Sequence, residues 1–183
     1  MKKIILIAAS FVSFGFAANA QNATGTATQT VNLALSNALE ITFTGSTTNV
    51  GATVALPFTT VNDYANGVES GSQELKVRSN KNFTINVKAS AANFTTTTGG
   101  VTSASSMPVS GVLNLLVASN NTAGTISNGF GSYTSLTSAP QDLITNASKG
   151  GNQTFSVKYK ATPGFAYPAA TYSTDVIYTA TQQ

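Results

Sequence analysis

Residues 75–78 (LKVR) and 83–88 (FTINVK) decide the fold class of this chain. Apolar and polar residues alternate strictly through both stretches, which is the pattern of a half-buried β-strand. The residues between them, 79–82 (SNKN), have the length and composition of a hairpin connection. We therefore predict an antiparallel hairpin with one core face and one solvated face, on which Lys76, Arg78 and Lys88 lie together.

The same alternation recurs on both sides of this hairpin. Before it, the pattern predicts successive strands over 29–35 and 38–43 and an edge strand over 54–58, which contains Pro57. After it, further strands are predicted at residues 107–109, 112–117, 143–144, 155–160 and 172–181. Eight or nine short strands with turn signals between them are typical of an all-β sandwich. We predict an immunoglobulin-like Greek-key β-sandwich.

Three stretches carry no clear strand pattern. Residues 62–72 and 91–106 are rich in turn-forming and small polar residues, so we expect loops there. Residues 119–140 form either a long loop or a pair of weak strands. Phe130 and Tyr133 are large side chains within it, and they either bind a ligand such as a glycan or pack back onto the sandwich.

The composition argues against catalysis. The chain has no His and no Cys, which excludes Ser-His-Asp and Cys-His catalysis and the common zinc sites. Asp63 and Glu69 stand in one loop, where they offer either a carboxylate pair, oxygen ligands for calcium, or the caps of an ordinary turn. We expect no catalytic residue, no metal and no cofactor, and the chain is predicted not to be an enzyme.

Charge is sparse, because only 8% of the residues are charged against about 25% in ordinary domains. No basic stripe is present, so nucleic acid is not an expected partner. A weakly charged surface does little to prevent self-association.

The N-terminus has the three parts of a secretory signal peptide. Lys2 and Lys3 precede an uncharged apolar run over residues 4–17, and residues 18–20 (ANA) form a small-x-small cleavage site. We therefore expect residues 1–20 to be removed, and the chain to be exported and to begin near Gln21. The alternative is an N-terminal membrane anchor, for which the run is short.

Four blocks, taken in order, resemble a known family. They are residues 28–35 leading into 39–41, the 75–77 and 83–87 strand pair, residues 107–109 (MPV), and an ending of Pro, Ala, Tyr, Ser and Val over 168–176. Over nearly the whole mature chain, this layout resembles the cysteine-free major pilins of chaperone–usher fimbriae, the alpha class of colonisation-factor fimbriae. Ala170 or Thr171 stands where the family often has Gly, which leaves the subfamily open.

The resemblance implies a mechanism. Such pilins have a sandwich that lacks a strand, and the N-terminal extension of the next copy fills the gap by β-strand addition. Residues 21–37 would then be the extension and 38–183 the incomplete sandwich, with Val31, Leu33 and Leu35 as the donated side chains. The implied product is a fimbria or pilus on the cell surface that supports adhesion or biofilm formation. The implied partners are copies of the chain, a periplasmic chaperone and an outer-membrane usher.

Other interpretations remain open at this point. The N-terminal strand could pair within its own domain. The chain could be a monomeric, secreted or surface-attached adhesin or carbohydrate-binding module, whose ligand contacts Phe130 and Tyr133. A small secreted hydrolase using Asp63 and Glu69 is the third alternative.

Overall fold

The computed structural model describes residues 24–46, 48–98, 100–127 and 129–183, so the predicted signal peptide lies outside the described residues. The chain divides into two units, Met1–Leu35 and Ser36–Gln183, and each is considered by itself. In the first unit, residues 24–35 form neither helix nor strand, and all of them are exposed. The strand predicted over 29–35 is therefore not formed in the isolated chain, because a strand needs a partner for its backbone groups.

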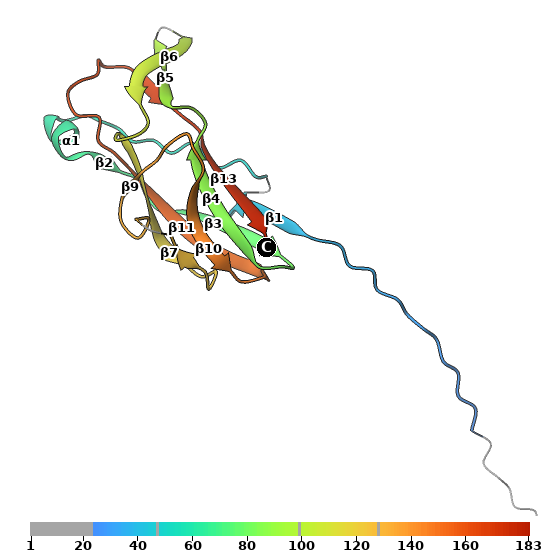
Figure 1. Ribbon diagram of the computed structural model, residues 1–183. Helices are drawn as coiled ribbons and strands as arrows, with labels where there is room; N and C mark the ends of the chain where they lie inside the picture. The colour runs from blue at the N-terminus through green and yellow to red at the C-terminus, as the bar shows by residue number, and fades with distance from the viewer. Residues whose placement is uncertain (1–23, 47, 99, 128) are drawn as a thin grey trace, which may run out of the picture. The chain divides into compact units, whose positions relative to one another are not determined.

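The second unit is built mainly from two antiparallel sheets (Figure 1). The first sheet has the order β1 (Leu39–Phe43), β3 (Gln73–Ser79), β11 (Gly150–Ala161), β7 (Leu113–Asn120) and β9 (Thr134–Ser135), and the short β2 (Val68–Glu69) also pairs with β11. The second sheet has the order β13 (Val176–Gln182), β4 (Phe83–Ala89), β10 (Gln141–Ala147) and β8 (Thr125–Ile126).

The two sheets face each other across one hydrophobic core. Leu75, Leu115 and Phe155 point into it from the first sheet, and they are fully buried. Phe83 and Ile85 meet them from the second sheet and are equally buried. The predicted all-β sandwich is thus confirmed, while the finer immunoglobulin-like Greek-key assignment stays a prediction.

The central strand pair differs from the predicted hairpin. β3 pairs with β1 and β11, whereas β4 pairs with β10 and β13, so the two strands belong to opposite sheets. The turn at 79–82 therefore crosses from one layer to the other. Strict alternation gives the same pattern in both arrangements, because each strand has one buried face in either case.

A third sheet occupies most of the stretch that we expected to be a loop over 91–106. It has the order β12 (Thr171–Ser173), β5 (Asn93–Thr98) and β6 (Val101–Pro108). Hydroxyl pairs support it, with 2.9 Å between the Oγ1 atoms of Thr97 and Thr102. Threonine favours strands even where no apolar alternation marks them, which is why the pattern missed this sheet.

The only helix in the described residues is short. α1 (Val61–Asn66) begins after Thr60, whose hydroxyl accepts a hydrogen bond from the backbone N–H of Asp63, and the Asp63 carboxylate caps Thr60 in return. No helix among these residues is long and apolar enough to cross a membrane. The edge strand predicted over 54–58 is absent, and Val54 and Leu56 pack on the core from irregular chain.

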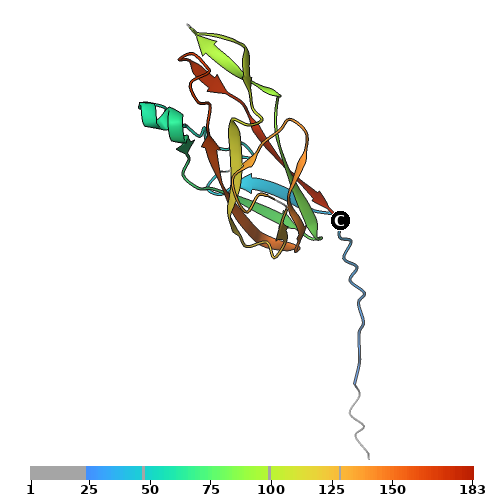
Figure 2. The same cartoon turned by 60° about the vertical axis from the view of Figure 1, so that its left-hand side comes forward.

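The sandwich has two ends that matter below. At the C-terminal pole, β13 ends, β1 begins and the 79–82 turn lies, as the pairings of Leu39 with Ser79 and of Gln182 with Phe83 require. The helix pole is the opposite end, where β11 finishes and pairs with β2 beside α1. Figures 1 and 2 show α1 far from the C-terminus in both views.

Candidate functional site

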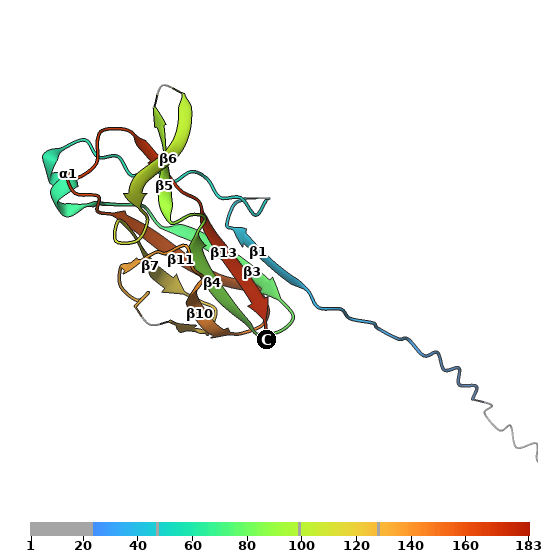
Figure 3. The same cartoon turned by 45° about the horizontal axis from the view of Figure 1, so that its top comes forward.

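Two neighbouring strands leave one backbone edge each without a partner. Among the residues that the structure describes, β1 pairs only with β3, and β13 pairs only with β4. The two strands lie side by side, as Figures 1 and 3 show, yet no ladder joins them within the described part of the chain. We call the free edges of β1 and β13 the open seam. A free edge offers N–H and C=O groups to another strand.

Apolar side chains along the open seam are only partly buried. On β13 they are Val176, Tyr178 and Ala180, which alternate with exposed residues and pack against the core. On β1 they are Ile41 and Phe43. The inward side chains of neighbouring β4 are fully buried by contrast, so the core is less completely covered at the seam than beneath the middle of the sheet.

Tyr178 is the central side chain of the seam. Its ring makes edge contacts with Phe43 of β1 and Phe155 of β11, each with ring centroids 6.2 Å apart. Its hydroxyl lies 2.7 Å from the hydroxyl of Tyr159. Burial raises the pKa of both phenols, that of Tyr178 well above its ordinary value, so both stay neutral and can share the hydrogen bond.

The predicted donor residues lie in the other unit and are free in this chain. The exposed fractions of Val31, Leu33 and Leu35 are 73%, 78% and 86%. Single exposed apolar side chains are ordinary, but three at alternate positions of one segment form an apolar stripe whenever that segment is extended.

A clamp holds the chain where the second unit begins. The side-chain amide of Asn80 donates to the carbonyl oxygen of Ser36 at 2.8 Å, and its oxygen accepts from the N–H of Ala38 at 3.0 Å. The Gln182 side chain donates to the same Asn80 oxygen and to the carbonyl of Ala38. Asn80 thus ties the start of β1 to the end of β13.

Phe130 is buried in the core, and it also lines the hollow described below. Its exposed fraction is 2%, and its carbonyl accepts a hydrogen bond from the N–H of Val117. Of the two alternatives for this residue, packing back onto the sandwich is the one observed. The surrounding stretch contains the two short strands β8 and β9, as one of the alternatives for residues 119–140 predicted.

Tyr133 is partly buried in a small polar cluster. The ammonium group of Lys160 lies 5.7 Å from the centre of its ring and 3.3 Å from Glu69 Oε1. Burial, and then the adjacent Glu69, raise the pKa of Tyr133 to about 12. The Tyr133 hydroxyl, and then Lys160, lower the pKa of Glu69. The ring of Tyr133 therefore packs against Lys160, beside the ion pair of that lysine with Glu69.

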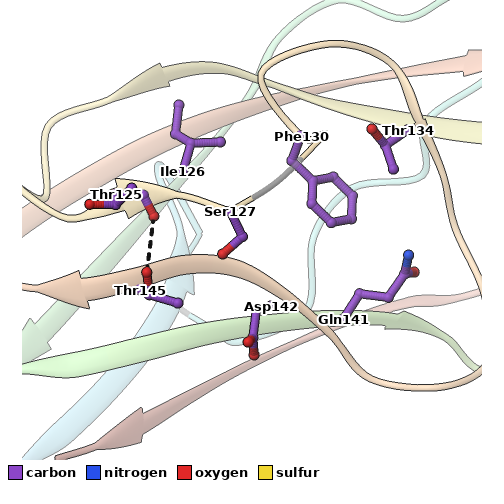
Figure 4. A pocket seen from close by; sticks show the side chains of 8 residues that line it. All are labelled: Thr125, Ile126, Ser127, Phe130, Thr134, Gln141, Asp142 and Thr145. Atoms are coloured by element: carbon purple, nitrogen blue, oxygen red, sulfur yellow. Dashed lines mark hydrogen bonds between the residues drawn. The ribbon is translucent and has the colours of Figure 1, made fainter.

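A hollow of about 470 Å³ lies beside β8 and β10 (Figure 4). Its one carboxylate, Asp142, accepts a hydrogen bond from Asn86 at 2.7 Å. The Gln141 amide is bonded to the backbone of Thr137 and Ser135. With a single carboxylate and no basic side chain among its lining residues, the hollow has no acid–base pair.

The remaining candidates for chemistry have structural roles. Backbone hydrogen bonds from Thr60, and then from Thr59, lower the pKa of Asp63 and fix its carboxylate in the helix cap. No group of three His, Cys, Asp or Glu side chains within the described ranges could hold a metal ion. Lys76 and Arg78 belong to the first sheet and Lys88 to the second, so the predicted common basic face is not formed; Arg78 instead pairs with Glu40 at 3.5 Å.

No known family model matches the chain, and no curated protein matches it either.

Sequence reasoning identified the apolar stripe of the extension but missed the open seam and the Asn80 clamp. Alternation over 172–181 predicted one strand, which the structure divides into β12 and β13 in different sheets, and nothing in that pattern says which strands flank β13. Asn80 was assigned only to a turn, although the sequence of β13 also indicated a polar contact at this end of the sandwich. Gln182 is a polar residue on the inward-facing register of β13, which suggests a polar partner at that end.

Proposed function

We propose that the chain is the structural subunit of an extracellular filament, whose copies are joined head to tail by donated N-terminal strands. The open seam carries the proposal. It combines an unpaired strand edge with core side chains that are incompletely covered, and an additional strand would satisfy both.

The extension supports the proposal from the other side. Its apolar stripe of Val31, Leu33 and Leu35 has the period of a strand with one buried face, and the isolated chain leaves that stripe exposed. Head-to-tail contacts that do not close into a ring generate an open filament. Sparse charge and the absence of thiols are compatible with repeated association outside the cell.

The proposal carries further requirements. The chain would be exported, and the seam would need cover before assembly, because exposed apolar edges aggregate. A periplasmic chaperone and an outer-membrane usher would meet that need. Adhesion or biofilm formation would be the role of the filament.

Electron microscopy of protein sheared from the cell surface tests this function. The test variant combines Val31→Asp and Leu33→Asp, which should abolish the filaments because two carboxylates would enter an apolar site. The control combines Asn32→Asp and Ala34→Asp, which adds the same charge to the other face of the same strand.

Filaments in the parent and the control but not in the test variant are the expected result. Single particles of one size in all three samples would contradict the proposal. They would leave the monomeric adhesin as the better interpretation.

A further inference from the structure

An exposed apolar cluster at the helix pole has no role in the fold described so far. The ring of Tyr64 in α1 stacks on Phe165, with ring centroids 5.6 Å apart. The ring of Phe58 also contacts Tyr64, with ring centroids 5.3 Å apart. Phe165 and the nearby α1 residue Val61 are 68% and 73% exposed. We call Phe58, Val61, Tyr64 and Phe165 the aromatic cluster. Exposed apolar side chains such as Phe165 and Val61 often mark an interface.

A shallow hollow of about 870 Å³ lies at the opposite end of the molecule, at the C-terminal pole. Its lining combines small and apolar residues with polar and charged ones, namely Asn37, Ala38, Leu39, Glu40, Arg78, Ser79, Asn80, Lys149, Gly150 and Gly151. The cluster and the hollow belong to the same side of the sandwich, because β11 begins at Gly150 in the hollow and ends at Ala161, paired with β2 next to α1.

The direction of a donated strand follows from where the chain enters and leaves the sandwich. The extension departs at the C-terminal pole, where β13 also ends. A donor strand parallel to β13 would bring the C-terminal pole of the donating copy against the C-terminal pole of the receiving copy. Each copy would then have to contact both of its neighbours through that one pole. A donor antiparallel to β13 instead puts the C-terminal pole of one copy on the helix pole of the next. Only the antiparallel arrangement can be repeated from copy to copy along a filament.

The connection between donor strand and sandwich is too short to leave a space between two copies. Residues 36–38 join Leu35 to β1, and a chain segment from Leu35 to Ala38 spans at most about 11 Å. Asn80 also binds Ser36 and Ala38 to the sandwich surface, so this segment cannot swing outward freely. The two poles must therefore be in side-chain contact.

We propose that the aromatic cluster docks into the hollow at the C-terminal pole of the next copy, as a second interface beside the donated strand. The inference rests on the proposed function. The occupant of the hollow is a second copy of this chain, because head-to-tail assembly brings the C-terminal pole of one copy against the helix pole of the next, where the cluster lies. The interface would set the stiffness of the filament rather than its formation, since the donated strand alone links the copies.

The test measures the persistence length of the filaments by electron microscopy, in variants of the aromatic cluster and in variants of the hollow. Val61→Ser with Phe165→Ser removes the apolar surface of the cluster, and both side chains are so exposed that the isolated fold does not depend on them. Gly151→Arg places a long side chain in the hollow, and a Cβ atom at Gly151 meets no atom within 4 Å in the single copy. A third sample combines all three substitutions.

Matched controls change the same kinds of residue elsewhere. Val50→Ser removes an equally exposed valine outside the cluster. Gly131→Arg introduces an arginine at a glycine that is equally open and lies outside the hollow. Both controls should leave the persistence length unchanged.

We expect filaments in every sample, with a shorter persistence length in the cluster variant and in Gly151→Arg. The combined variant should be no more flexible than either alone, because two changes at one contact are not additive. Unchanged stiffness in both variants would overturn the second interface while leaving donor-strand assembly intact. Absence of filaments in the parent would overturn both proposals.

Discussion

The hydroxyl groups of Tyr159 and Tyr178 share a single hydrogen bond of 2.7 Å inside the sandwich. Removing one partner leaves the other hydroxyl buried without a hydrogen bond, which costs about 1–3 kcal/mol, whereas removing both can be nearly neutral. We therefore expect a single substitution in this pair to cost more stability than the substitution of both tyrosines.

We predict that Tyr178→Phe lowers the free energy of unfolding by about 1–3 kcal/mol. The double variant with Tyr159→Phe and Tyr178→Phe should recover most of that loss. Urea denaturation of the parent, both single variants and the double variant measures this. A double variant that costs the sum of the two single variants would contradict the pairing.

The same pair predicts a dependence on alkaline pH. Unfolded tyrosines lose their protons near a pKa of about 10, while burial holds the pKa of both folded phenols above that value. The folded state then binds more protons than the unfolded state, so stability falls as the pH rises from about 10 through the folded-state pKa.

Denaturation midpoints at about pH 8 and about pH 11 measure this loss. The parent should lose more stability between the two conditions than the Tyr159→Phe, Tyr178→Phe variant. All other side chains are the same in both proteins, so their contributions to the loss cancel in the comparison. Equal losses would show that the buried phenols do not control the alkaline limit.

At the scale of elements, Gly67 joins α1 to β2. Its φ angle is +79°, and a Cβ atom there would lie 2.6 Å from the carbonyl oxygen of Ala161. Both features require glycine, because other residues rarely adopt that backbone and the neighbouring backbone cannot move away cheaply.

We predict that Gly67→Ala lowers the free energy of unfolding by about 1–3 kcal/mol and loosens β2 from the end of β11. Hydrogen exchange of the β2 and β11 amides locates the effect. Gly71→Ala is the control, since Gly71 has an ordinary φ and a Cβ there meets nothing within 4 Å. Equal effects of the two substitutions would contradict the strain argument.

Most elements with an apolar alternation could be predicted from sequence, although the alternating stretches 29–35 and 54–58 form no strand in the single chain. Leu75, Val77, Phe83 and Ile85 marked β3 and β4 correctly, since a half-buried strand requires that spacing. Their partners could not be predicted, because alternation reports burial and not pairing. β5 was missed since threonine carries it, and α1 was missed because six residues are too few for a helical period.

The candidate site follows the same division. The stripe of Val31, Leu33 and Leu35 is visible in sequence, because a strand that buries one face has a local period. The open seam depends on strand order, which no local pattern contains. Phe130 could not be assigned from sequence, since an aromatic residue in an irregular segment can face solvent or core.

At the scale of the whole molecule, the extension should act as a ligand of the sandwich. We predict that deleting residues 21–35 leaves a folded chain that does not polymerise. The deletion stops before Ser36 because Asn80 binds that residue. A synthetic peptide of residues 24–35 should then stabilise the shortened chain, by about 2.7 kcal/mol at a concentration one hundred times its Kd.

Thermal unfolding with and without the peptide measures this stabilisation. A peptide carrying Val31→Asp and Leu33→Asp is the control, and it should not raise the unfolding temperature. A shortened chain that is unaffected by the parent peptide, while remaining folded, would contradict the donor role of the extension.

The position of the Asn80 clamp has a mechanical consequence. Tension along an assembled filament would enter each copy at Ser36, next to the clamp, and would reach the neighbouring copy through the strand laid against β13. That strand and β13 would be pulled lengthwise in opposite directions, so their hydrogen bonds would be loaded together in shear rather than broken one at a time by peeling. A thread built in this way would resist fluid drag without a single covalent crosslink between its subunits.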